Sequence, residues 1–143
     1  MTKQKVGADF SPPGAPIRPP IDVVAAIIER GGCFLVTLRP DGTHLAGHWE
    51  FPGGKVHHSE THAEALRREV FEELDCVVDV GALVHEVTHA YPEKTVRLFF
   101  YECTVSGEPK PMMGQQMRWV PRRGLAALPF PDADRGLIGL LMS

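Results

Sequence analysis

Runs of apolar residues divide the chain into short segments that are typical of β-strands. Ile21–Glu29 is rich in β-branched and aliphatic residues, and Cys33–Arg39 repeats this composition after Gly31 and Gly32. Two glycines between two apolar runs predict a tight turn, so we expect these runs to form a hairpin. Because both runs are apolar on both faces, we expect the hairpin in the middle of a sheet and not at its edge.

A polar, glycine-containing stretch follows, and it separates the hairpin from a helix. Pro40–His48 is expected to be a loop, Trp49–Phe51 a short strand, and Gly53–Gly54 a sharp turn. From about Thr61 to Leu74 apolar residues recur at helical spacing, which predicts a helix with one face packed on a sheet. Its glutamates are expected on the opposite face.

The second half of the chain predicts further strands and short helices. The predicted elements are, in order, strands over Val77–Ala90, Lys94–Val105 and Met117–Val120, a short helix over Arg122–Ala127 and a final helix from Pro131 to Leu141. Alternation in the first of these strands puts Leu83, His85, Val87 and His89 on one face. The whole order indicates an α/β domain in which a mixed β-sheet is sandwiched between α-helices.

Length and composition indicate one globular domain without a surface suited to duplex nucleic acid. A chain of 143 residues can bury a substantial core, and its net charge of −3 does not provide the basic surface needed for duplex nucleic acid. No apolar stretch approaches the roughly 20 residues that span a bilayer, so no membrane partner is expected. Five prolines within residues 1–20 predict a flexible N-terminal segment, with the folded domain over residues 21–143.

Cysteines and histidines add no metal or disulfide pattern of their own. Cys33, Cys76 and Cys103 are widely spaced and odd in number, which favours neither zinc nor a disulfide framework. The first residues lack the apolar stretch of a secretory signal, so a reducing cytoplasmic location is expected. The seven histidines form no H-E-x-x-H or comparable arrangement.

The most informative feature is an acidic cluster near the end of the predicted helix. Glu69, Glu72 and Glu73 stand at i, i+3 and i+4, so they share one face and repel one another. A hard divalent cation would relieve this repulsion, and Mg²⁺ usually bridges protein carboxylates to substrate phosphates. Acidic helix faces are often merely solvated. Here Glu60 lies at the helix start and Arg68 can hold carboxylates through paired hydrogen bonds, which favours a metal site for phosphate chemistry.

The run from Gly54 to Cys76 resembles the Nudix box, G-x5-E-x7-R-E-U-x-E-E-x-G-U, in which U is aliphatic. The matching residues are Gly54, Glu60, Arg68, Glu69, Val70, Glu72 and Glu73. Asp75 replaces the glycine that ends the helix in this pattern. Aspartate tolerates the left-handed conformation better than most residues, so we expect the turn to survive.

Segments outside the box are similar to the MutT-type branch of the family, the enzymes that sanitise the nucleotide pool. They are Trp49–Lys55, Val96–Tyr101, Arg118–Val120 and Leu128–Asp134. The resemblance implies a Nudix fold and Mg²⁺-dependent hydrolysis of a nucleoside triphosphate to the monophosphate and pyrophosphate, with Mn²⁺ as a possible substitute. It implies catalytic roles for Glu69, Glu72, Glu73 and Arg68. The Gly53 carbonyl is expected to join the three glutamates as a metal ligand.

For the substrate, the resemblance points to Arg39, Lys55, Phe51 and Asp134. Asp134 stands where the best-known members use asparagine to read oxidised guanine, so the base is open between an oxidised purine and a cytosine. Met113 stands where many members carry a further glutamate, and Glu93, Glu102 and Glu108 are candidates to replace it.

Three functions remain open from the sequence. The first is a triphosphate pyrophosphohydrolase that acts on a nucleotide such as 8-oxo-dGTP. The second is a hydrolase of (d)CTP, 5-methyl-dCTP or another nucleoside diphosphate derivative. The third is a catalytically dead module that binds a nucleotide or a partner. The protein is expected as a monomer or a homodimer.

Overall fold

The computed structural model describes residues 19–143. Residues 1–18 lie outside the described residues, and with them nearly all of the segment predicted to be flexible. The first strand begins at Ile21.

The elements follow the predicted order with one additional strand. They are β1 (Ile21–Arg30), β2 (Cys33–Leu38), β3 (Trp49–Glu50), β4 (Gly53–Lys55), α1 (His62–Leu74), β5 (Val77–Tyr91), β6 (Lys94–Ser106), β7 (Met117–Pro121), the 3₁₀ helices η1 (Arg122–Ala127) and η2 (Asp132–Asp134), and α2 (Arg135–Met142). The strands run β3-β2-β1-β6-β5 across the sheet, while β4 pairs with β1 and β7 with β2. The β1–β6 pair is parallel and the others are antiparallel, so the predicted mixed sheet is confirmed.

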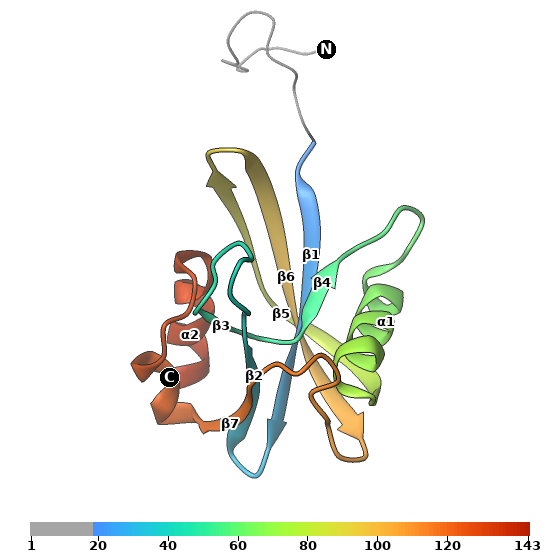
Figure 1. Cartoon of the computed structure of the whole chain (residues 1–143), viewed down its shortest axis with the longest axis vertical. Helices are drawn as coiled ribbons and strands as arrows, with labels where there is room; N and C mark the ends of the chain where they lie inside the picture. The colour runs from blue at the N-terminus through green and yellow to red at the C-terminus, as the bar shows by residue number, and fades with distance from the viewer. Residues whose placement is uncertain (1–18) are drawn as a thin grey trace, which may run out of the picture.

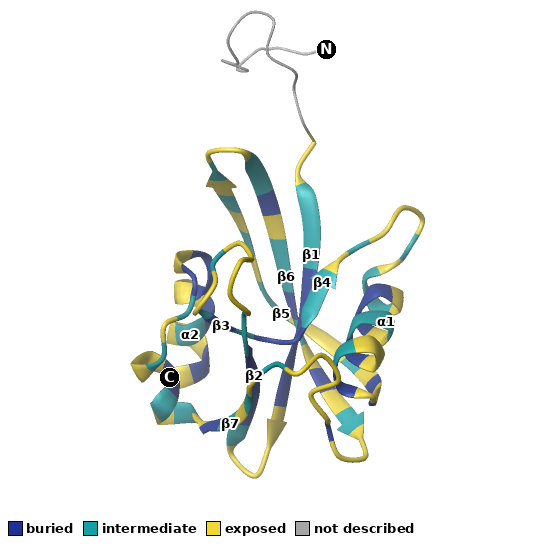
Figure 2. Ribbon diagram, viewed as in Figure 1, coloured by how far each residue is buried: buried dark blue, intermediate teal, exposed yellow. Residues whose placement is uncertain are grey.

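Strand β1 supplies apolar side chains to two separate cores. Val24, Ala26 and Ile28 pack with the buried face of α1, whereas Ala25 and Ile27 pack on the opposite face with the buried side of α2. Successive side chains of a strand point to opposite faces, so an uninterrupted apolar run is what a strand buried on both sides requires. Figure 1 shows α1 and α2 on either side of the strands, and Figure 2 shows the buried positions between them.

The β1–β2 hairpin is central as predicted, but its strands soon separate. They pair only near the turn, through Glu29 with Phe34 and Arg30 with Cys33. Beyond this point β1 pairs with β4, while β2 pairs with β7 and β3. The separation opens space between the two halves of the sheet, next to the end of α1.

The prediction of a turn at Gly53 and Gly54 is wrong, because both residues lie in β4. Neither has a positive φ angle, so glycine is required here for space and not for conformation. A Cβ atom at Gly53 would lie 2.0 Å from the carbonyl oxygen of Val24. Glycine therefore allows β4 to lie directly against β1.

The predicted alternation in β5 fails at Leu83. The pairing of β5 with β6 shifts between Val80 and Leu83 and again between Leu83 and His85. Such irregularities reverse the facing of the local residues, so Leu83 is 47% exposed and Val84 packs on the α2-side core instead. From His85 to His89 the predicted alternation holds.

Helix α1 begins and ends as its sequence predicts. Thr61 accepts a hydrogen bond from the Glu64 backbone N–H, and the Glu64 carboxylate accepts one from the Thr61 N–H, which forms a capping box. Asp75 ends the helix with φ 55° and ψ 40°, so the left-handed turn survives without glycine. The final predicted helix is divided into η2 and α2. No helix among residues 19–143 is long and apolar enough to span a membrane.

Candidate active site

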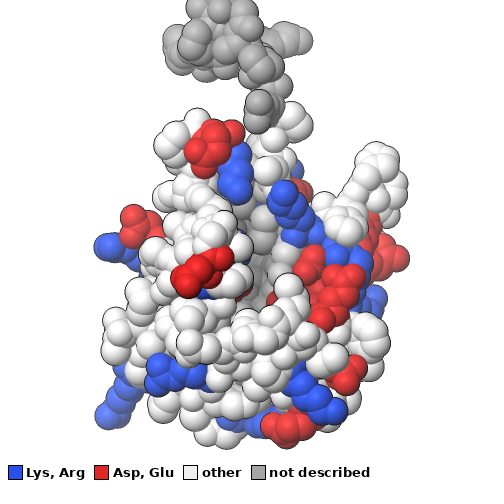
Figure 3. All heavy atoms as spheres, in the orientation of Figure 1, with Lys and Arg blue, Asp and Glu red and all other residues white. Residues whose placement is uncertain are grey.

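A cavity of about 470 Å³ lies where β1 and β2 separate. Figure 3 shows this hollow, with acidic side chains gathered on the side where α1 lies. The predicted site residues that line it are Phe51, Gly53, Lys55 and Glu73 together with Arg39 and Asp134. Arg68 and Glu72 do not line the cavity, and Glu69 stands directly behind it against Gly54.

Arg68 organises the acidic residues of α1 from behind. Its Nε and Nη2 atoms donate to the two carboxylate oxygens of Glu60 at 2.7 and 3.0 Å, and Nη1 donates to Glu69 at 2.8 Å. Nη2 also donates to the carbonyl of Lys55, which ties α1 to β4. The hydrogen bonds from Arg68, with one from the His57 backbone N–H, lower the pKa of Glu60 to about 2. Glu60 therefore holds Arg68 in place.

Glu69 and Glu73 form a close pair between α1 and β4. A Cβ atom at Gly54 would lie 2.4 Å from the carboxylate carbon of Glu69, so only glycine leaves room for this carboxylate. Burial, followed by the hydrogen bond and charge of Glu69, raises the pKa of Glu73 well above its ordinary value. The predicted glutamate face is therefore not simply opposite to the packing face. Of Glu69, Glu72 and Glu73, only Glu72 points outward, with its side chain 58% exposed and 3.5 Å from Arg68.

This pair suits a divalent cation, whose charge would offset the repulsion between the two carboxylates. Carboxylate oxygens are the ligands that Mg²⁺ prefers, and two desolvated carboxylates in contact need a positive partner. No three His, Cys, Asp or Glu side chains within residues 19–143 are already grouped as a metal site. The donor chemistry fits, but the full set of Glu69, Glu72, Glu73 and the Gly53 carbonyl is not assembled in advance.

Glu50 is a site residue that the sequence analysis missed. Its neighbours Trp49 and Phe51 are both buried in the α2-side core, so alternation along the strand turns Glu50 toward the cavity. Burial raises the pKa of Glu50, although its ion pair with Arg39 at 2.9 Å opposes this effect. The two flanking aromatic residues were the signal that could have identified it.

The far end of the cavity has an apolar floor and two charged groups. Phe51 stacks on Phe130 with ring centres 5.4 Å apart, and it is both core and cavity wall. Arg39 is held by Glu50 and by the carbonyl of His44. Asp134 is only 5% exposed, and burial together with the charge of Glu50 raises its pKa to about 7.

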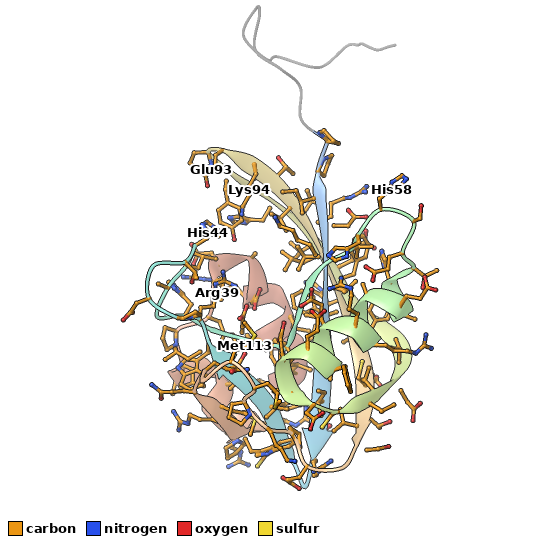
Figure 4. The ribbon with its side chains drawn as sticks, turned by 45° about the vertical axis from the view of Figure 1, so that its right-hand side comes forward. Arg39, His44, His58, Glu93, Lys94 and Met113 are labelled. Atoms are coloured by element: carbon orange, nitrogen blue, oxygen red, sulfur yellow. The ribbon has the colours of Figure 1, made fainter. Side chains whose placement is uncertain are left out.

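Loops from three parts of the chain form the rim of the cavity. Figure 4 shows Arg39 and His44 from the loop after β2, Lys94 at the tip of the β5–β6 hairpin, and Met113 close to α1. Met113 is exposed and lines the cavity. None of the glutamates considered as replacements at this position, Glu93, Glu102 and Glu108, lines the cavity.

Comparisons with known proteins agree with this architecture. The family model of the NUDIX domain matches residues 23–140. The chain is 38% identical over 125 residues to an 8-oxo-dGTP diphosphatase of Haemophilus influenzae, covering 86% of this chain and 92% of that relative. It is 52% identical over 64 residues to a CTP pyrophosphohydrolase of Escherichia coli, covering 45% and 47%. The crystal structure of a MutT protein from Methanosarcina mazei superposes with a TM-score of 0.79 at 26% identity, covering 89% and 96%.

The box residues, the fold and these similarities agree with one another. The chain belongs to the Nudix hydrolase family, in its MutT-like branch.

Proposed function

We propose that this protein is a Mg²⁺-dependent nucleoside triphosphate pyrophosphohydrolase that acts on an oxidised purine nucleotide such as 8-oxo-dGTP. The observation that carries the proposal is that one cavity is lined both by Glu73, which is paired with Glu69 behind the wall, and by the buried Asp134. The similarity to the Haemophilus influenzae 8-oxo-dGTP diphosphatase supports the same choice.

At the acidic end, Glu69, Glu72 and Glu73 with the Gly53 carbonyl would hold Mg²⁺, and Mn²⁺ would substitute. The bound ion supplies charge neutralisation at the phosphate oxygens and a more acidic water. Arg68 holds the Glu69 carboxylate in place, and Glu60 holds Arg68. Lys55 at this end would face the triphosphate, and Arg39 and Lys94 further along the cavity lining would face the rest of the nucleotide.

At the other end, the base would lie on the apolar floor with its polar edge toward Asp134. A pKa of about 7 leaves much of Asp134 protonated at neutral pH. A protonated carboxyl has one donor and one acceptor, whereas a carboxylate only accepts. The protonated form can pair with the N1–H donor and O6 acceptor of a guanine edge, and the ionised form can accept from the guanine N1–H and N2–H donors.

A cytosine nucleotide is the second candidate, including (d)CTP and 5-methyl-dCTP. The ionised form of Asp134 can accept from the exocyclic amine of cytosine. The CTP pyrophosphohydrolase of Escherichia coli is 52% identical to this chain over 64 residues.

Pyrophosphate release with Mg²⁺ tests these alternatives, using 8-oxo-dGTP, dGTP, dCTP and 5-methyl-dCTP with an ADP-sugar and a diadenosine polyphosphate. Fast release from 8-oxo-dGTP supports the proposal, and preference for a cytosine nucleotide would replace it with the second candidate. If no substrate releases pyrophosphate but a nucleotide binds tightly, the protein is a module that only binds nucleotides.

A further inference from the structure

Met113 places an exposed sulfur atom at the rim of the catalytic cavity. Met113 exposes 72% of its surface to solvent, compared with 54% for its neighbour Met112. Met113 lines the cavity, and Met112 does not. Met117, four residues further on, is partly buried and packs against the α1-side core. Three methionines close together in sequence therefore differ sharply in their access to solvent and to the site.

The backbone around Met113 is fixed while its side chain is free. The Met112 N–H donates to the carbonyl of Glu73 at 3.0 Å, and the Met113 N–H donates to the side-chain oxygen of Gln115 at 2.9 Å. The Gln115 amide nitrogen donates in turn to the same Glu73 carbonyl at 3.1 Å. These bonds tie the loop to the last turn of α1, at the backbone of Glu73. A change at the Met113 side chain would therefore act on the site without releasing the loop.

Two of the cysteine sulfurs are poorly placed to react with an oxidant from solvent. Cys76 and Cys103 are buried, and burial raises the pKa of the Cys103 thiol to about 11. Thiols react with oxidants mainly as thiolates, so Cys103 is protected by both its position and its protonation. A methionine thioether reacts with an oxidant without losing a proton, so its exposure to solvent determines how fast it is oxidised.

We propose that Met113 is a site of reversible oxidation by hydrogen peroxide, and that its sulfoxide strengthens binding of the divalent cation at the neighbouring carboxylates. In this step the Met113 sulfur attacks one peroxide oxygen, an S–O bond forms and the O–O bond breaks. The sulfur loses two electrons and peroxide is reduced. The proton on the transferred oxygen passes to the second oxygen, which leaves as water. The effect on the cation rests on the proposed function; the oxidation does not.

The expected consequence follows from the change in ligand type. A thioether is a soft group that Mg²⁺ does not bind, whereas oxygen donors suit this ion. A sulfoxide oxygen at the cavity rim can accept a hydrogen bond from water bound to the ion. Groups that act on a metal through such contacts change its affinity by about 10–100-fold, so we expect the dissociation constant for Mg²⁺ to fall by roughly tenfold.

The oxidation is tested by brief peroxide treatment of the full-length protein, followed by peptide mass spectrometry. Met113 should gain one oxygen faster than Met112, and both should react faster than Met117. Treatment with methionine sulfoxide reductases should remove the oxygen. Preferential oxidation of Met112 or Met117 would overturn the assignment of the site.

The effect on the cation is tested by calorimetric titration with Mg²⁺ alone, before and after peroxide. The wild-type protein should bind more tightly after treatment, Met113→Leu should show no change, and the matched control Met112→Leu should behave like wild type. Met113→Gln, with a permanent oxygen acceptor, should resemble the oxidised wild type. Oxidation of Met113 without tighter binding would overturn the role of the sulfoxide. If the untreated protein binds no Mg²⁺ at the carboxylates, the proposed function fails as well, while the peptide map still decides the oxidation.

Discussion

The two ends of the cavity are built in different ways. The acidic end comes from one short stretch of chain: Gly54 and the glutamates of α1 are linked through Arg68 and Glu60. The opposite end collects Arg39, Asp134 and the β5–β6 tip from distant segments. An end made from one continuous run keeps its geometry when the surrounding loops change. An end assembled from several loops can acquire a different ligand specificity through changes in those loops, and the acidic end is then left undisturbed.

The largest expected effect lies at the acidic end. Glu73→Gln should lower turnover by roughly 10²–10⁴-fold, since metal-ligand and general-base roles each have effects of this order. The fold should remain intact, because the neutral side chain keeps its size and removes a repulsion with Glu69. Pyrophosphate release measures the loss of turnover, and thermal unfolding shows whether the fold is intact. Glu86→Gln, an exposed glutamate outside the cavity, is the matched control. A Glu73→Gln variant with full turnover would remove this residue from the mechanism.

Gly54→Ala should affect the same end through geometry alone. The new methyl group would overlap the Glu69 carboxylate and displace it. Misplacement by about 1 Å can cost up to ~10²-fold in rate, so turnover should fall by about one to two decades. Gly139→Ala is the control, because a Cβ at that position in α2 meets open space. It should preserve turnover and increase stability by about 0.5–1 kcal/mol. Equal turnover in the two variants would show that the Glu69 position is not critical.

At the opposite end, Asp134→Asn should reveal the cost of ionising a buried carboxyl. The pKa of Asp134 is raised from 3.8 to about 7, so the neutral group contributes stability that is fully present below pH 3.8. This contribution is lost as the pH rises through about 7. Asparagine cannot ionise. The free energy of unfolding of Asp134→Asn, relative to that of the wild type, should therefore increase between pH 4 and 7.5 by an amount on the order of 1–4 kcal/mol.

Urea unfolding across this pH range measures the difference. Asp132→Asn, which alters a largely exposed carboxylate two residues away, should show little of it. A constant difference between wild type and Asp134→Asn at all pH values would mean that Asp134 does not titrate in this window.

The smallest expected effect concerns the support of Arg68. The pKa of Glu60 is lowered from 4.5 to about 2, chiefly by its hydrogen bonds with Arg68. Its contribution to stability is therefore present above pH 4.5 and is lost as the pH falls toward 2. Glu60→Gln should be slightly less stable than the wild type at pH 7, and the two urea midpoints should converge toward pH 2. Midpoints that separate further in acid would contradict the assignment.

The difference between the two ends also explains what could be predicted from the sequence. The box residues, the αL turn at Asp75 and the two-faced β1 depend on local spacing, and the structure agrees with these predictions. Local spacing could not show that Gly53 and Gly54 belong to a strand, because their need for space comes from Val24 and Glu69. Glu50 was missed because its partners, Arg39 and the box glutamates, are distant in sequence.

The parallel pairing of β1 with β6 has a consequence for how this chain folds. Asp22 and Arg97, which face each other in that pair, are separated by 75 positions along the chain. Contacts of such long range require a large loop to close before they stabilise anything, and they slow folding. The box helix can form early from local contacts, but the strand on which it packs lacks its parallel neighbour until β6 has been synthesised. A ribosome-bound fragment ending near Tyr91 should therefore contain helix α1 without a protected β1. Hydrogen exchange on fragments of increasing length would show when β1, the strand on which α1 packs, becomes protected.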